Sequence, residues 1–109
     1  MDASRVKEVI TAQWFLYLVR CRNGTLYAGI STDVQRRFAE HQQGGAKGAR
    51  YLRGKGPLTL VFQMPVADRS EATRLELWLK KQPRRVKERI INKEVCIYKL
   101  FAISAKNNC

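Results

Sequence analysis

The stretch from Tyr27 to His41, "YAGISTDVQRRFAEH", combines residue types that can act together on a phosphate. A tyrosine and a glycine end an expected strand, and the short helix that follows has Arg37 and His41 one turn apart. An arginine fork matches the geometry of phosphate oxygens, while tyrosine and histidine donate and accept hydrogen bonds. A purely structural explanation also exists, in which the segment is a turn, a helix cap and a solvated helix.

The faces of this helix separate its two arginines. At about 100° per residue, Val34 and Phe38 mark the side that packs on the protein. Arg37 and His41 border this apolar stripe, so their polar ends should emerge where the helix meets the sheet. Arg36 falls on the far side and is expected to form an exposed pair with the glutamate four residues later. Arg37 is the better candidate for chemistry, although an ordinary surface charge also explains it.

A later helix supplies one carboxylate. Ala72, Leu75 and Leu79 have the spacing of a core stripe, and Glu76 lies at its margin. A carboxylate at the edge of a core is costly unless a cation or hydrogen bonds satisfy it. Glu76 therefore either pairs with an arginine or binds a hard metal ion such as Mg²⁺.

A hairpin is expected to bring two tyrosines together. Its turn is Asn23-Gly24, so Tyr17 and Tyr27 should lie roughly opposite each other and face the same side. Gly29 follows at the exit of the strand, where a missing side chain lets another backbone or a ligand approach closely. Strand tyrosines are also common as plain core or surface aromatics.

The charge of the chain points to a polyanionic partner. Among 109 residues, 21 are Lys or Arg and nine are Asp or Glu, which leaves a net charge of +12. The longest apolar run, Trp14 to Val19, is too short to span a bilayer, and the start of the chain lacks a signal-peptide pattern. We therefore expect a cytoplasmic protein without membrane association. A zinc site is not expected, because His41 is the sole histidine and no C-x-x-C pair occurs.

Two basic segments are candidates for binding nucleic-acid phosphates. One is the glycine-rich loop over residues 42–57, which has no acid, and the other is the third helix, where Glu88 is the exception. Within the loop, "GARYLRGKG" differs from a P-loop because its glycine spacing is one residue too long and a glycine follows the lysine. Solubility alone would also explain such charges. The candidate residues are Lys47, Arg50, Arg53, Lys55, Arg84, Arg85, Lys87 and Arg89.

The elements that must position these side chains follow from periodicity, turn residues and caps. Thr32 is the expected N-cap of the first helix, and Asp68 and Glu71 have capping-box spacing before the second. The segment from Val95 to Ile103 is apolar enough to pack on the core, as either a helix or a strand. The other expected elements are strands at Trp14–Arg20, Thr25–Ala28 and Leu58–Met64, and helices at Asp68–Lys81 and from Pro83 to about Lys93.

This order predicts an α/β fold with a small three-stranded, mainly antiparallel sheet flanked by helices. Residues 1–13 are expected to form an N-terminal lead-in, 14–94 the functional domain, and 95–109 a tail that packs on the domain or trails from it.

Taken together, "FLYLV", "LYAG", "RRFAEH" and the later glutamate resemble the GIY-YIG nuclease superfamily. The segments "GAKGARYLRGKGPLTLVF" and "EATRLELWLKKQ" narrow the resemblance to the small single-domain YhbQ-like subgroup. The resemblance extends roughly from Trp14 to Asn92. The first element lacks the leading glycine and the isoleucine of the family pattern, and Ala28 replaces an isoleucine in the second. These replacements are apolar and keep both tyrosines.

The resemblance implies a site with one divalent cation, Mg²⁺ or Mn²⁺, held by Glu76. Tyr17 would act as the base once positive charge lowers its pKa, and Tyr27 would orient water or phosphate. Arg37 would clamp the phosphate, and His41 would assist phosphate binding or proton transfer. The implied catalytic set is Tyr17, Tyr27, Gly29, Arg37, His41 and Glu76.

The leading expectation is a monomeric, metal-dependent endonuclease that cuts DNA in repair or recombination, with RNA as the other possible substrate. The alternative is a non-catalytic DNA- or RNA-binding module with the same fold. A third interpretation is a small protein that docks on a larger acidic partner. Binding alone does not require an acid beside the core stripe, so Glu76 favours the enzyme.

Overall fold

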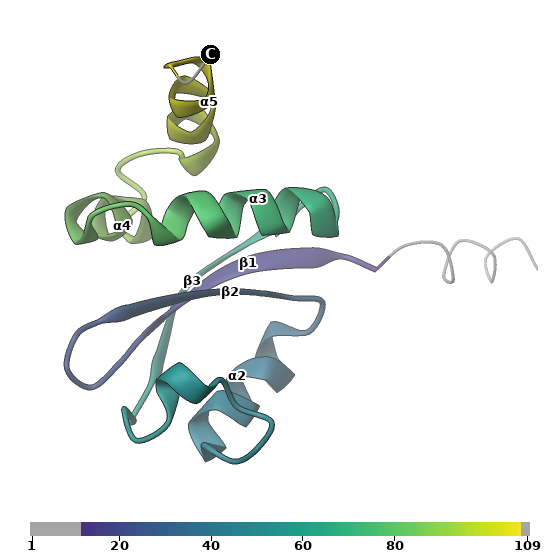
Figure 1. The fold of residues 1–109 in the computed structure, drawn as a ribbon, viewed down its shortest axis with the longest axis vertical. Coiled ribbons are helices and arrows are strands. Elements are labelled where there is room, and N and C mark those ends of the chain that lie inside the picture. The colour runs from purple at the N-terminus through teal and green to yellow at the C-terminus, as the bar shows by residue number, and fades with distance from the viewer. Residues whose placement is uncertain (1–11, 108–109) are drawn as a thin grey trace, which may run out of the picture.

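A three-stranded antiparallel sheet lies at the centre of the computed structural model, which describes residues 12–107 (Figure 1). Its strands are β1 (Trp14–Arg20), β2 (Leu26–Ser31) and β3 (Thr59–Val66). The strand order is β2-β1-β3, so β1 is central and both neighbours are edge strands. β2 is the returning strand of the hairpin, and it begins later and is longer than the predicted Thr25–Ala28. The predicted three-stranded, mainly antiparallel sheet is confirmed.

Helices cover both faces of this sheet. α2 (Val34–Gln43) lies on one side, together with the loop that contains the 3₁₀ turn η1 (Arg50–Leu52). α3 (Arg69–Lys80) runs across the opposite face beside α4 (Arg84–Ile91), and α5 (Ile97–Asn107) stands beyond them (Figure 1). The apolar segment after Val95 is thus a helix. Most of the predicted lead-in, residues 1–11, lies outside the described residues.

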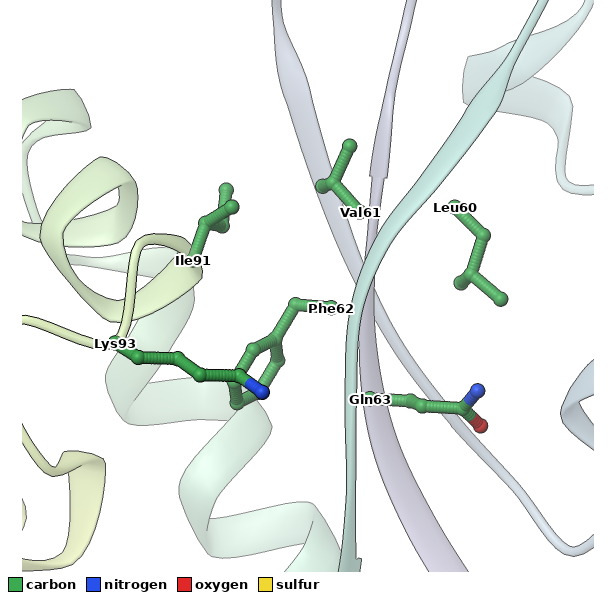
Figure 2. Close-up of a pocket in the computed structure, with 6 residues that line it drawn as sticks. All are labelled: Leu60, Val61, Phe62, Gln63, Ile91 and Lys93. Carbon is green, nitrogen blue, oxygen red and sulfur yellow. The ribbon is translucent and has the colours of Figure 1, made fainter.

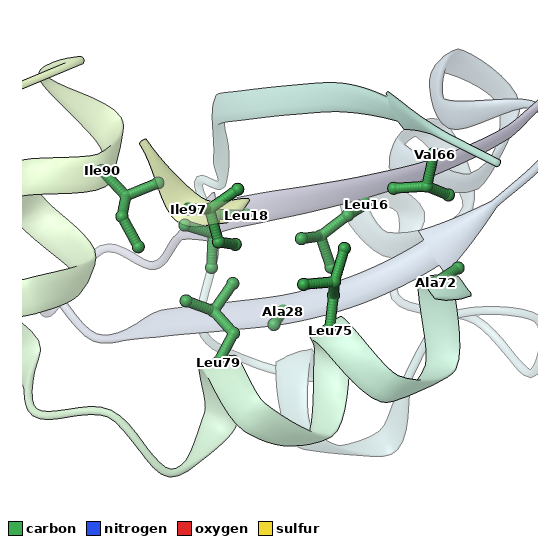
Figure 3. Packing of buried hydrophobic residues seen from close by; sticks show 9 residues of the cluster. All are labelled: Leu16, Leu18, Ala28, Val66, Ala72, Leu75, Leu79, Ile90 and Ile97. Atoms are coloured by element: carbon green, nitrogen blue, oxygen red, sulfur yellow. The ribbon is translucent and has the colours of Figure 1, made fainter. Parts of the chain in front are cut away.

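The alternation of β1 divides the core into two clusters. Leu16 and Leu18 face α3, where they pack against the predicted stripe of Ala72, Leu75 and Leu79 (Figure 3). The intervening residues of β1 point the other way, because successive side chains of a strand face opposite sides of the sheet. This second cluster consists of Tyr17, Val19, Cys21, Val34, Leu52 and Leu58. The candidate tyrosine and α2 therefore share one core.

Two helix starts show where local prediction succeeded and failed. Asp68 caps α3 as predicted, because its Oδ1 accepts the Glu71 N–H at 2.8 Å. For α2 the cap is Asp33, whose Oδ1 accepts the Arg36 N–H at 3.1 Å, and not the predicted Thr32. Both residue types favour this position, and Asp33 is the cap because the first helical residue is Val34.

Glu88 has a definite structural role within the basic helix α4. The two guanidinium nitrogens of Arg20 donate to its carboxylate oxygens at 2.7 and 2.8 Å. These hydrogen bonds lower the pKa of Glu88 to about 2. The paired charges attach α4 to the end of β1. Within residues 12–107, no helix combines the length and the apolar character needed to cross a membrane.

Candidate active site

A hydrogen-bonded series links Tyr17 on β1 to His41 on α2 and then to the loop after α2. The Tyr17 hydroxyl lies 2.9 Å from His41 Nε2, and the Ala49 N–H donates to His41 Nδ1 at 3.1 Å. Because Nδ1 accepts a backbone proton, the ring proton belongs on Nε2, which then donates to the Tyr17 oxygen. The hydroxyl proton of Tyr17 is left for another acceptor.

Burial fixes the protonation states of this pair. Burial, helped by the positive charge of Arg37, lowers the pKa of His41, so its ring is neutral near pH 7. Burial also raises the pKa of Tyr17, with a further increase from neighbouring Tyr27 and a smaller opposing effect from Arg37. With only the protein's own groups around it, Tyr17 is therefore a neutral phenol.

Gly29 makes room for the Tyr17 ring. The two residues are direct partners in the β1–β2 register, and a Cβ on Gly29 would lie 2.5 Å from the Tyr17 hydroxyl oxygen. The close approach expected at this glycine is therefore made by an aromatic side chain. Tyr27 pairs with Val19, so the two tyrosines share a face as predicted but are diagonal to each other. The Tyr27 and His41 rings meet edge to face, with centroids 5.6 Å apart.

The two arginines of α2 have different surroundings. Arg37 is half-buried; its Nη1 donates to Glu40 Oε1 at 2.9 Å and to the Lys47 carbonyl. The Arg36 side chain is 64% exposed and only approaches Asp33 and Glu40, at 3.6 and 3.4 Å. The predicted pair of Arg36 and Glu40 forms, but the Glu40 side chain is only 16% exposed and makes its shorter contact with Arg37. The i,i+3 spacing of Arg37 and Glu40 was an available signal for this contact.

The loop backbone over residues 47–49 holds both polar residues of α2. The Lys47 carbonyl accepts from Arg37, and the Ala49 N–H donates to His41. Gly48, between them, is buried against the end of α2, where an added Cβ would lie 2.8 Å from the Glu40 carbonyl oxygen. The basic loop therefore positions the site in addition to its predicted binding role.

Glu76 approaches the tyrosines from the other layer of the fold. Its side chain is 18% exposed, and its Oε2 lies 3.4 Å from Lys80 Nζ. Lys80 Nζ in turn lies 5.8 Å from the centre of the Tyr27 ring. The negative charge of Glu76 is also close enough to contribute to the raised pKa of Tyr17. The partner of Glu76 is thus a lysine one turn away, where the sequence suggested an arginine.

The carboxylate of Glu76 fits a hard divalent cation. Among residues 12–107, no group of three or more His, Cys, Asp or Glu side chains is gathered to hold a metal. Mg²⁺ commonly needs only one or two carboxylates, because waters and substrate phosphates complete its octahedron. Glu76, with the Tyr17 oxygen in electrostatic range, matches that requirement.

The predicted phosphate-binding cations differ in their surroundings. In the loop, Lys47, Arg50 and Arg53 are exposed, and Lys55 Nζ lies 4.1 Å from the centre of the Tyr51 ring. In α4 the set divides. Two of its cations approach acidic residues: Arg84 lies 3.4 Å from Glu88, and Arg89 lies 3.5 Å from Glu94. Lys87 lines a cleft together with Tyr51. Arg85 is exposed. Tyr51 was not among the predicted site residues; only its exposure in the folded loop reveals it.

A second concave region lies away from the candidate active site. A shallow cavity of about 280 Å³ lies on β3 near the end of α4 (Figure 2). Its wall contains no carboxylate, histidine or tyrosine; the lining residues are Leu60, Val61, Phe62, Gln63, Ile91 and Lys93. It shares no residue with the candidate site around Tyr17 and Tyr27.

The sheet order, the tyrosine pair and the arginine and histidine of α2 define a nuclease-type domain, and a family comparison agrees. The model of the GIY-YIG catalytic domain matches residues 13–89, and the chain belongs to this family. Its relatives include the UPF0213 protein YhbQ of Escherichia coli K12, 56% identical over 78 residues, which are 72% of this chain and 76% of the relative.

Other relatives support the same assignment. The UPF0213 protein of Cronobacter sakazakii is 55% identical over 83 residues, which cover 76% of this chain and 85% of the relative. The solution NMR structure of the protein EF2693 from E. faecalis is 32% identical, with a TM-score of 0.53 over 76% of this chain and 86% of that one. The resemblance to the YhbQ-like subgroup is confirmed. The names of these relatives state no activity.

Proposed function

We propose that this protein is a divalent-cation-dependent endonuclease that hydrolyses phosphodiester bonds in DNA. The observation that carries the proposal is the hydrogen-bonded series from the Ala49 N–H through His41 to Tyr17. This series holds a buried phenol in a fixed orientation and leaves its proton available to a phosphate or water oxygen. Membership in the nuclease family and the net charge of +12 support a nucleic-acid substrate.

Each residue of the site has a role that its contacts permit. The hydrogen bonds that Arg37 donates to Glu40 and to the Lys47 carbonyl both use Nη1, and hydrogen bonding from Arg37 also works against the raised pKa of Tyr17. The remaining N–H groups of the guanidinium can donate to a phosphate. Such a preorganised fork stabilises the negative charge that grows on the phosphate oxygens in the transition state. Glu76 would hold Mg²⁺ or Mn²⁺, and the bound cation would supply positive charge at the phosphate.

Tyr17 can donate in its neutral form and accept a proton only after losing its own. Its raised pKa means that burial opposes the base role, and a nearby positive charge must offset that effect. Because His41 donates to the Tyr17 oxygen, it stabilises the phenolate once that forms. We therefore propose that the Tyr17 hydroxyl contacts the reacting water or phosphate. His41 is its hydrogen-bond partner, and Tyr27 lies beside both residues.

We propose a cytoplasmic monomer that acts on DNA in repair or recombination, with residues 14–94 as the catalytic unit. A binding module with the same fold is the alternative function, and the exposed cations of the loop would suit it equally. An experiment that separates binding from cleavage decides between the two.

Tyr17→Phe should remove cleavage while leaving DNA affinity and its salt dependence almost unchanged. The substitution deletes the hydroxyl next to His41 and keeps the buried ring, so we expect a loss of about 10²- to 10⁴-fold in rate. Cleavage of nicked, flapped, forked and intact duplexes in Mg²⁺ or Mn²⁺ measures the rate. A salt titration of duplex binding measures affinity, with an expected log–log slope of about −4 to −5 if about five phosphates are neutralised.

The control for binding is charge reversal at Arg50 and Arg53. It should flatten the salt slope and weaken binding to all sequences alike, because phosphate contacts contain no base information. If Tyr17→Phe cuts at the parental rate, the catalytic assignment is wrong. If the parent binds DNA but cuts none of the substrates, the binding module replaces the enzyme.

Gly48→Ala should slow cleavage by about 10- to 100-fold. The added Cβ would meet the Glu40 carbonyl oxygen at 2.8 Å and push the loop away from α2, so the contacts to Arg37 and His41 would loosen. Displacing a catalytic group by about 1 Å can cost about 10²-fold in rate.

Gly45→Ala is the matched control, because Gly45 is exposed and an added Cβ would meet nothing within 4 Å. Rates measured beside thermal melting curves separate displacement of the site from global unfolding. Equal rates for the two variants would show that the loop does not position the site.

A further inference from the structure

A cleft follows the open edge of β2 and continues beyond the proposed catalytic residues. Its first part encloses about 320 Å³ and includes Tyr27, Tyr51, Lys80 and Lys87 in its wall. A second part of about 260 Å³ shares Tyr51 and Lys87 and reaches Arg84 near the hairpin turn. The two parts form a path that begins at the tyrosine site and leads along β2.

Tyr51 gives this path an aromatic wall. The neighbouring Leu52 is buried at 2% exposure and fixes the 3₁₀ turn in the core, while Tyr51 itself is 48% exposed. The Tyr51 ring lies nearly parallel to the Tyr27 ring, at 19° with centroids 5.9 Å apart. The Lys55 ammonium lies over the Tyr51 ring. An exposed aromatic ring is thus held in a defined orientation beside the site.

The charged groups on the wall are all cationic. Lys80, Arg84 and Lys87 line the path, and no acidic side chain of the described residues does so. Glu76 and Glu88 each approach one of these cations at 3.4 Å. Lys87 has no ion-pair partner among residues 12–107, so its charge is available to a ligand anion.

Cations beside an exposed strand edge can also serve to prevent pairing with another strand. That explanation does not account for Tyr51, because an exposed aromatic ring makes an open edge more adhesive. The combination of stacked aromatics and cations is the one that binds unpaired nucleotides, in which each base offers a flat face and each phosphate a charge. The volume of either part is enough for about one nucleotide and is far too small for a duplex.

We propose that this cleft binds an unpaired nucleotide adjoining the scissile phosphate, with its base stacked on Tyr51 and its phosphate at Lys87. The inference rests on the proposed function and specifies its substrate as nucleic acid with a single-stranded segment at the cut. The base takes the place of the Lys55 ammonium over the Tyr51 ring and continues the stack that begins at Tyr27. The displaced lysine then pairs with a phosphate.

The test compares three fluorescein-labelled DNAs by fluorescence anisotropy, in chelator so that nothing is cut. They are a short single strand, a strand of equal length built from abasic units, and a blunt duplex. Tyr51→Leu should weaken binding of the normal single strand by about 5- to 100-fold, the effect of losing one stacked base. Binding of the abasic strand and of the duplex should stay at parental values, which also shows that the variant is folded.

Two further variants sharpen the result. Tyr51→Phe keeps the aromatic face and should bind the single strand as the parent does. Tyr98→Leu changes another exposed tyrosine, 38% exposed on α5, and should affect none of the three DNAs.

The proposal is overturned if Tyr51→Leu binds the normal strand as the parent does, or if it weakens the abasic strand equally. An equal loss for the duplex would overturn it as well. Because these measurements need no cleavage, they are independent of the catalytic assignment. Parental protein that binds none of the DNAs would instead refute the proposed function itself.

Discussion

Glu76→Gln should lose about 10³-fold or more of the cleavage rate while keeping the fold and the affinity for DNA. The amide has nearly the shape of the carboxylate but lacks the negative charge that a hard divalent cation requires. Several kcal/mol of transition-state stabilisation depend on such a cation, and each 1.4 kcal/mol corresponds to about tenfold in rate. The measurement is the single-turnover rate across a range of Mg²⁺ and Mn²⁺ concentrations, with DNA affinity recorded in parallel.

The ion pair between Glu76 and Lys80 offers a competing explanation for this carboxylate. If the residue were only half of that pair, Glu76→Gln would change stability by at most about 1 kcal/mol and leave the rate alone. Glu94→Gln is the matched control, because Glu94 is also paired with a cation but its side chain is 54% exposed. Undiminished cleavage by Glu76→Gln, or by the parent in excess chelator, would remove the metal role.

Arg37→Ala should reduce cleavage by about 10²- to 10³-fold, and Arg36→Ala should have little effect. The two residues are adjacent on α2 and both contact Glu40, but only Arg37 is half-buried and also fixed by the Lys47 carbonyl. Losing one preorganised charge contact to a transition state typically costs this much. Single-turnover rates on one common DNA substrate provide the comparison.

Arg37→Lys distinguishes charge from geometry in this prediction. A lysine keeps the positive charge but loses the planar fork, so we expect its rate to fall between those of the parent and Arg37→Ala. The Arg36 variant serves as the control for total charge, since both alanine variants remove one cation from the same helix. Equal losses from the two alanine variants would show that Arg37 contributes no more to cleavage than its charge.

Local patterns in the sequence were sufficient for the order of the three strands and of α2, α3 and α4, and for much of the core. The spacing of Ala72, Leu75 and Leu79 predicted the buried stripe of α3, and Asp68 predicted its first turn. These features depend on interactions within one helical turn, so a single segment contains the information. The family resemblance, which the domain comparison confirmed, selected Tyr17 and Glu76 from many residues with ordinary structural explanations. Their catalytic roles remain predictions.

Tertiary structure alone decided how these residues meet. It placed Tyr17 opposite Gly29 and brought the loop backbone at Ala49 onto His41. It also left Tyr51 exposed against Tyr27, and so created the cleft. Several of these contacts join segments that are far apart in the chain, and strand register and loop packing set their distances. A hydrogen bond or a stack requires atoms to be placed within fractions of an ångström, which residue spacing along a single chain does not specify.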